Sequence, residues 1–120
     1  MASKQMLIIF AVVMAISVLP MITLAKTFTV GDGQGWTTGF DYQAWAKDKK
    51  IRVGDTLVFK YSKGAHNVQK VDGNGFDKCI KPSLNEALTT GNDAIRLTSI
   101  GKKKWYICGV GNHCRGEVRN

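Results

Sequence analysis

Short runs of alternating β-branched and aromatic residues recur through the chain after residue 25. They occupy residues 26–30, 56–61, 67–71, 94–97 and 104–108, and this pattern predicts strands. Turn-forming residues separate them at 31–33, 53–55, 72–75, 91–93 and 101. Only residues 41–48 and 83–88 are compatible with short helical turns, which are too short to form a layer. The pattern therefore predicts an all-β, single-domain antiparallel sandwich or barrel rather than a parallel α/β sheet.

The first 25 residues have a different pattern. Lys4 provides a positive start, residues 6–19 are almost wholly apolar, and the segment ends in the small Ala25. These features predict a secretory signal peptide over residues 1–25. Residues 6–25 are also about long enough to cross a bilayer, but Pro20 and the small-residue exit favour cleavage. We expect residues 26–120 to form one secreted domain, monomeric and not attached to a membrane.

The predicted mature domain is basic. The whole chain carries a net charge of +8, and Lys4 is the only charged side chain among the first 25 residues, so +7 remains. Lysines gather at Lys47, Lys49 and Lys50 and again at residues 102–104. Such charge favours an acidic partner, either an acidic protein or an acidic cell-wall polysaccharide, and secretion argues against nucleic acid. Solvated lysine-rich turns are an equally good interpretation.

Three cysteines, Cys79, Cys108 and Cys114, are present in a chain predicted to be exported. An oxidising compartment should pair two of them and leave one over. A disulfide across the 35 positions between Cys79 and Cys114 would contribute roughly 3–4 kcal/mol in the chain-entropy model. From the residues alone, Cys108 could equally pair with either of the others.

The Cys108 segment also has the features of a metal site. A thiol and an imidazole, Cys108 and His113, are five positions apart on a glycine-rich loop after a predicted strand, and His66 is the only other histidine. Two imidazoles and one thiolate suit copper and the trigonal geometry of electron-transfer sites. Zinc could use the same ligands for hydrolysis, but no glutamate or histidine base is evidently placed beside them. Each residue alone could be ordinary, but together they favour copper.

Six segments of the chain resemble the plant phytocyanins. They are residues 61–71, 76–79 and 105–114, together with 29–31, 35–36 and 52–57. The resemblance is greatest to the plantacyanin, or basic blue protein, branch, and it covers nearly all of residues 26–120. It implies a cupredoxin-like antiparallel Greek-key β-sandwich. It also implies that His66, Cys108 and His113 are the equatorial copper ligands.

The same resemblance assigns two supporting features. It implies a disulfide between Cys79 and Cys114. It also implies that the Asn67 side chain forms a hydrogen bond across the site and so holds the copper-binding loop closed. Metal ligands usually need such support from neighbouring residues. An ordinary turn at Asn67 is the simpler alternative.

The C-terminal residues depart from the family pattern. Counted from His113, the place of the axial ligand holds Val118, whereas alignment on Gly116 places Glu117 there. The four methionines all lie within residues 1–25, so none is expected to ligate. We expect the last strand to be truncated and the copper potential to be altered, because the axial ligand tunes it.

The resemblance implies a blue copper protein that carries single electrons outside the cell and is not itself an enzyme. The departure at the C-terminus motivates an alternative, a non-redox module with a degraded metal site. Such a module would bind the cell wall or act in signalling, for example in reproductive guidance, because members of the family are associated with the plant cell wall and reproductive tissue.

Overall fold

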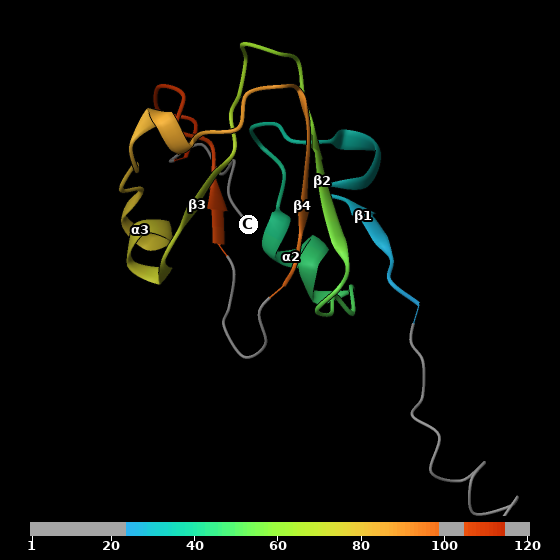
Figure 1. The fold of residues 1–120 in the computed structure, drawn as a ribbon. Helices are drawn as coiled ribbons and strands as arrows, with labels where there is room; N and C mark the ends of the chain where they lie inside the picture. Colours follow the sequence, from blue (N-terminus) through green and yellow to red (C-terminus); the bar gives the residue numbers. More distant parts are fainter. Residues whose placement is uncertain (1–23, 99–104, 115–120) are drawn as a thin grey trace, which may run out of the picture.

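The computed structural model describes residues 24–98 and 105–114 (Figure 1). The predicted signal peptide is almost entirely outside these residues, as are residues 102–104 and the two candidate axial positions, Glu117 and Val118. The elements follow in the order β1 (Thr27–Thr29), η1 (Asp32–Gln34), α2 (Tyr42–Lys47), β2 (Thr56–Lys60), β3 (Gln69–Val71), α3 (Gly73–Lys78), η2 (Leu84–Glu86), β4 (Asn92–Arg96) and β5 (Trp105–Ile107). Over the described ranges, no helix is both long and apolar enough to traverse a bilayer.

The strands form two sheets, as a sandwich requires. One has three strands in the order β1-β2-β4 and the other pairs β3 with β5. β2 runs antiparallel to β4 and β3 antiparallel to β5, but β1 runs parallel to β2, with Thr27 opposite Thr56. The all-β prediction is confirmed, with one parallel pair that the antiparallel expectation did not include.

Alternation along β2 places the main core between the sheets. Leu57 and Phe59 are buried while their neighbours are more exposed, as expected for a strand with one face against the core. Trp36 packs edge-on against Phe59 with 5.0 Å between ring centroids. Tyr42 of α2 also packs against Trp36, with 4.9 Å between ring centroids. Trp36 is therefore a core side chain.

β5 separates two hydrophobic clusters. Tyr106 and Cys108 belong to the main core, whereas Ile107 packs with Phe76 of α3 in a second cluster, which Trp105 joins. This arrangement follows from the alternation of side chains along a strand. Cys108 consequently leaves the strand on the side that faces the main core.

The helix α3 replaces the turn that the sequence predicted at residues 72–75. The Asp72 carboxylate accepts a hydrogen bond of 2.7 Å from Gly75 N and so caps the helix. Phe76 then anchors the helix in the second cluster. The prediction was wrong because the two glycines outweighed the cap and the buried phenylalanine, although tertiary packing can stabilise a short helix of low propensity.

Two further boundaries differ from the predictions. β4 begins at Asn92, within the turn predicted at residues 91–93, because Asn92 and Asp93 pair with Lys60 and Phe59 of β2. Residues 83–88 yield only the 3₁₀ turn η2. The helix predicted at residues 41–48 is confirmed as α2, and the Asp41 side chain caps its first turn.

Candidate metal centre

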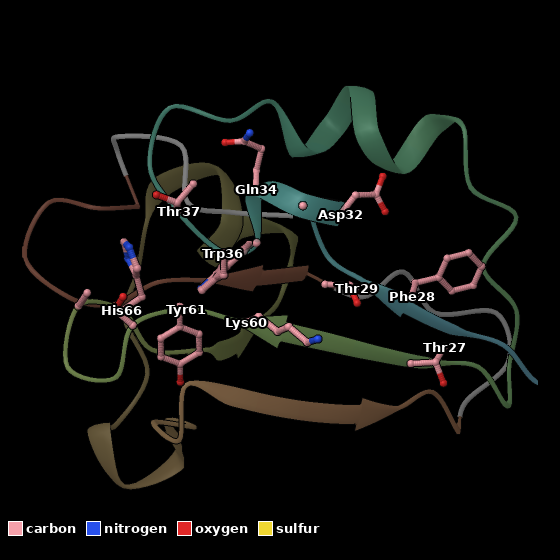
Figure 2. Close-up of a pocket in the computed structure, with 14 residues that line it drawn as sticks. Thr27, Phe28, Thr29, Asp32, Gln34, Trp36, Thr37, Lys60, Tyr61 and His66 are labelled. Carbon is pink, nitrogen blue, oxygen red and sulfur yellow. The ribbon is translucent and has the colours of Figure 1, made fainter.

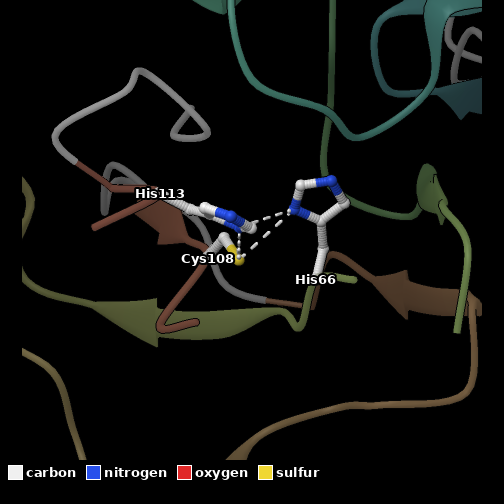
Figure 3. Close-up of side chains that lie close together, drawn as sticks. All are labelled: His66, Cys108 and His113. Atoms are coloured by element: carbon white, nitrogen blue, oxygen red, sulfur yellow. Dashed lines mark hydrogen bonds between the residues drawn. The ribbon is translucent and has the colours of Figure 1, made fainter. Parts of the chain in front are cut away.

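Two loops bring His66, Cys108 and His113 together, and Figure 3 shows their side chains directed toward one another. Cys108 Sγ lies 3.6 Å from Nδ1 of His66 and 3.6 Å from Nδ1 of His113. The two Nδ1 atoms are 3.1 Å apart. Each imidazole thus presents the same nitrogen to the sulfur, and all three donor atoms can face one small ion.

The loop after β5 places two of these side chains. Cys108 follows β5 directly and is fully buried. A turn then reverses the chain, with His113 N donating 3.0 Å to Val110 O and Gly111 at a positive φ of 50°. The sharp turn lets the imidazole fold back over the sulfur that precedes it by five positions, as the glycine content of the loop predicted.

The third side chain comes from the loop after β2. Ala65 N donates 2.9 Å to Ser62 O, and Gly64 adopts φ 91° within the turn that precedes His66. Burial, and then the neighbouring His113, lower the pKa of His66. Its imidazole is therefore neutral at neutral pH, with a nitrogen lone pair free to bind a metal.

The donor set fits a first-row transition metal. Zinc, an ion of comparable size, binds imidazole nitrogen at about 2.0–2.1 Å and thiolate sulfur at about 2.3 Å, and donor atoms 3.1–3.6 Å apart can all lie within such distances of one centre. Thiolate with two imidazoles favours copper and matches the trigonal set of electron-transfer sites. No carboxylate is part of the described cluster.

A disulfide fixes the far end of the loop. Cys79, at the C-terminus of α3, is bonded to Cys114, the residue after His113. The pairing implied by the resemblance is confirmed, and Cys108 is the free thiol. The covalent link holds the loop against α3 and leaves the buried sulfur for the metal.

Comparisons with known proteins agree with this geometry. Residues 36–118 match the plastocyanin-like domain family. The chain belongs to the phytocyanin family. It is 48% identical to blue copper protein 1a of Medicago truncatula over 95% of this chain and 69% of that protein, and 38% identical to the basic blue protein of Arabidopsis thaliana over 88% and 81%. Cucumber basic protein, a blue copper protein, superposes with a TM-score of 0.69 at 33% identity, over 78% of this chain and 93% of that one.

In this phytocyanin the fold is cupredoxin-like, and His66, Cys108 and His113 are positioned as a copper site. The sulfur is buried and the two imidazoles are half-buried, so solvent reaches the site at the rings rather than at the sulfur. The axial position is outside the described residues, so the choice between Glu117 and Val118 stays a prediction.

Asn67 connects the two ligand loops. Its Oδ1 accepts a 2.6 Å hydrogen bond from Gly109 N, and its backbone N–H points at Cys108 Sγ from 3.5 Å. Asn67 is 5% exposed, so little water competes for these bonds. The side chain thus spans from the residue after one ligand to the residue after another, and a buried donor near the sulfur is a means of tuning a copper–thiolate site.

Two supporting contacts were not predicted from the sequence. Trp36 Nε1 donates 2.8 Å to Asn67 O, which fixes the Asn67 backbone. Lys81 Nζ donates 2.7 Å to Gly111 O, on the turn before His113. The local sequence pattern does not predict either contact, because each depends on how distant segments fold together. The nearness of Lys81 to Cys79 in the sequence is the only feature that could have indicated the second contact.

Tyr61 lies beside His66, with the two rings nearly perpendicular and 6.3 Å between centroids. Its hydroxyl donates to the Asp93 carboxylate and contacts Leu88 O at 3.1 Å. Burial, followed by the hydrogen bond to Asp93, raises the pKa of Tyr61 to about 12. The ring is therefore a neutral, anchored wall on one side of His66.

Proposed function

We propose that this phytocyanin is a secreted type 1 copper protein that carries single electrons in the plant extracellular space and is not itself an enzyme. The observation that supports the proposal most directly is the convergence of one buried thiol and two imidazoles, all from the chain's own loops. Hydrolysis would additionally need a base beside the metal, and no carboxylate joins the described cluster.

Copper, when bound, supplies the one-electron couple between Cu(I) and Cu(II). The chain supplies the rigid frame. Three links tie the loop of residues 108–114 to two other segments. The Cys79–Cys114 disulfide and the Lys81–Gly111 hydrogen bond attach it to residues 79–81, and the Asn67–Gly109 hydrogen bond attaches it to the residue after His66. A frame held at several points keeps the ligand positions alike in both oxidation states.

The test is the visible spectrum of the purified protein after addition of Cu(II). Thiolate ligation should yield an intense blue charge-transfer band with one copper per chain. Cys108→Ser should abolish the band, whereas Asn112→Ala, on the same loop but exposed and not a donor in the cluster, should retain it. A blue band of unchanged intensity in Cys108→Ser would overturn the ligand assignment.

A folded but colourless wild-type protein would also overturn the electron-carrier proposal. In that case the alternative non-redox module, binding the cell wall or acting in signalling, would take its place. Far-ultraviolet circular dichroism distinguishes a folded colourless protein from an unfolded one, because it reports the folded state without requiring the metal.

The proposed partner is an acidic protein or an acidic wall polymer that meets exposed lysines. Lys47 and Lys50 are exposed, whereas Lys49 lies 3.4 Å from Asp32 and 5.5 Å from the Trp45 ring centre. Lys49 is therefore partly engaged within the domain. Electron exchange with an anionic partner should slow as ionic strength rises, and exchange independent of salt would argue against this docking.

Secretion is tested at the N-terminus. If residues 1–25 are a signal peptide, the protein recovered from the culture medium of a secreting plant cell line should begin at Lys26. Recovery of the intact chain from a membrane fraction would favour the rival anchor.

A further inference from the structure

A groove of about 810 Å³ follows β1 and the end of β2 and reaches the metal ligand His66. Figure 2 shows His66 at one end of it and Thr27 at the other, with Trp36 and Tyr61 near the His66 end. Residues of β1, η1, the end of β2 and the following loop line this hollow, and we call it the sheet-edge groove. Of the residues that line it, only His66 belongs to the donor cluster of the metal centre.

Five uncharged polar side chains line the groove. They carry hydroxyl or amide groups and come from both walls: Thr27, Thr29, Gln34, Thr37 and Ser62. Hydroxyls and amides each offer both donors and acceptors of hydrogen bonds. A matching ligand should likewise carry several groups that both donate and accept.

The charges of the lining cancel. Asp32 and Lys60 each contribute one charge to the walls, and Asp32 is 3.4 Å from the ammonium of Lys49. The exposed Lys47 and Lys50 do not line the groove. The groove therefore favours an uncharged ligand, in contrast to the lysine-rich surface proposed for acidic partners.

The wall that faces Lys60 is already formed without a ligand. Trp36 N donates 2.7 Å to Lys60 O, and the Tyr42 hydroxyl donates 2.5 Å to Gly35 O and accepts 2.8 Å from Thr37 N. Gly35 has a φ of 66°, and a Cβ there would lie 2.6 Å from Lys60 O, so glycine is required for this close approach. A preformed wall lowers the ordering cost of binding.

We propose that the sheet-edge groove binds a short, uncharged oligosaccharide. Sugar hydroxyls match the mixed donors and acceptors, and the half-buried Tyr61 ring offers an apolar face for sugar C–H groups. The volume is within the range of small-ligand sites, about 300–1,000 Å³. A bound sugar would lie against the His66 ring, so that carbohydrate binding and access to the copper ligand share one surface.

The test is nuclear magnetic resonance of the reduced, copper-loaded protein, which is diamagnetic, titrated with cellotetraose. Saturable shifts are expected at Thr29, Lys60, Ser62 and His66, with a Kd on the order of 1 mM. Thr29→Val and Lys60→Ala should each weaken binding about three- to tenfold, the loss expected for one hydrogen bond. The matched controls Thr98→Val and Lys70→Ala change the same residue types on exposed positions that do not line the groove.

The proposal is overturned if folded protein that was blue before reduction shows no saturable shift in the groove. It is also overturned if Lys70→Ala weakens binding as much as Lys60→Ala, or if trigalacturonate, the acidic probe, binds in the groove as tightly as cellotetraose. None of these results bears on the copper site, because the blue band of each sample is recorded in the oxidised state before reduction.

Discussion

Replacement of Gly109 by alanine should destabilise the protein, because the residue after the copper-ligand cysteine is packed against a buried glutamine. A Cβ at Gly109 would lie 1.8 Å from Gln69 Oε1 and 2.9 Å from its Cδ, whereas real Cβ atoms essentially never come within 3.0 Å of a heavy atom. Gln69 is 1% exposed, and its Nε2 donates 3.3 Å to Pro82 O. The glutamine therefore cannot swing into solvent without losing packing and a hydrogen bond.

The expected loss is about 1–3 kcal/mol of unfolding free energy, the usual cost of forcing a methyl group into a packed core. Strain on the 2.6 Å bond from Gly109 N to Asn67 Oδ1 should add about 1 kcal/mol. Urea denaturation of copper-free protein measures the change. Gly33→Ala is the matched control, because its Cβ would meet nothing within 4 Å and its φ is not positive.

A double-mutant cycle identifies the clash as the cause. In a Gln69→Ala background the Oε1 and Cδ atoms are gone, so Gly109→Ala should cost at least about 1 kcal/mol less than in the wild type. If Gly109→Ala is within about 0.5 kcal/mol of Gly33→Ala, or if its cost is the same in both backgrounds, the packing argument is refuted.

Three other changes test separate parts of the molecule. Asn67→Ala removes the bond to Gly109 N and should weaken copper binding about 10- to 100-fold in competition with a chelator; unchanged affinity would contradict its proposed role. Cys79→Ser opens the disulfide to Cys114 and should lower the unfolding free energy by roughly 3–4 kcal/mol, and added reductant should destabilise the wild type but not this variant. Hydrogen bonds from two backbone N–H groups lower the pKa of Asp55, so its contribution is present above the usual value of about 3.9 and is lost as pH falls through the lower folded value. Asp55→Asn should therefore make the loss of unfolding free energy toward acid pH less steep than in the wild type. Equal slopes in the two proteins would exclude the effect.

The strand pattern was predictable because each strand has one face against the core. In β2 the alternation of Leu57 and Phe59 with more exposed neighbours is local information. The parallel pairing of β1 with β2 was not predictable, since it depends on which edge of the sheet the first segment reaches. The helix α3 was missed for a related reason, because the packing of Phe76 against Ile107 stabilises it from outside the segment.

The three donor side chains were predictable for a chemical reason. A chain with only two histidines and an odd cysteine has few other ways to form a soft metal site. What holds the donors in place could not be read in the same way. The contact of Gln69 with Gly109 follows from the register of β3 against β5, in which Gln69 is opposite Ile107, and register is a property of the folded sheet.

Lys26 directly follows the predicted cleavage site and also contacts the folded domain. Its backbone N donates 2.8 Å to Asp55 Oδ1, and the other oxygen of the same carboxylate accepts 2.8 Å from Arg52 N. Cleavage after Ala25 would convert the Lys26 nitrogen from an amide into an α-ammonium, which adds the attraction between opposite charges to a hydrogen bond whose acceptor is already ionised. Because Lys26 directly precedes β1, whose edge pairs with β2, maturation at this bond would strengthen the attachment of the first strand at the moment the leader is lost. Cleavage one bond earlier, after Leu24, would leave Asp55 facing an ordinary amide.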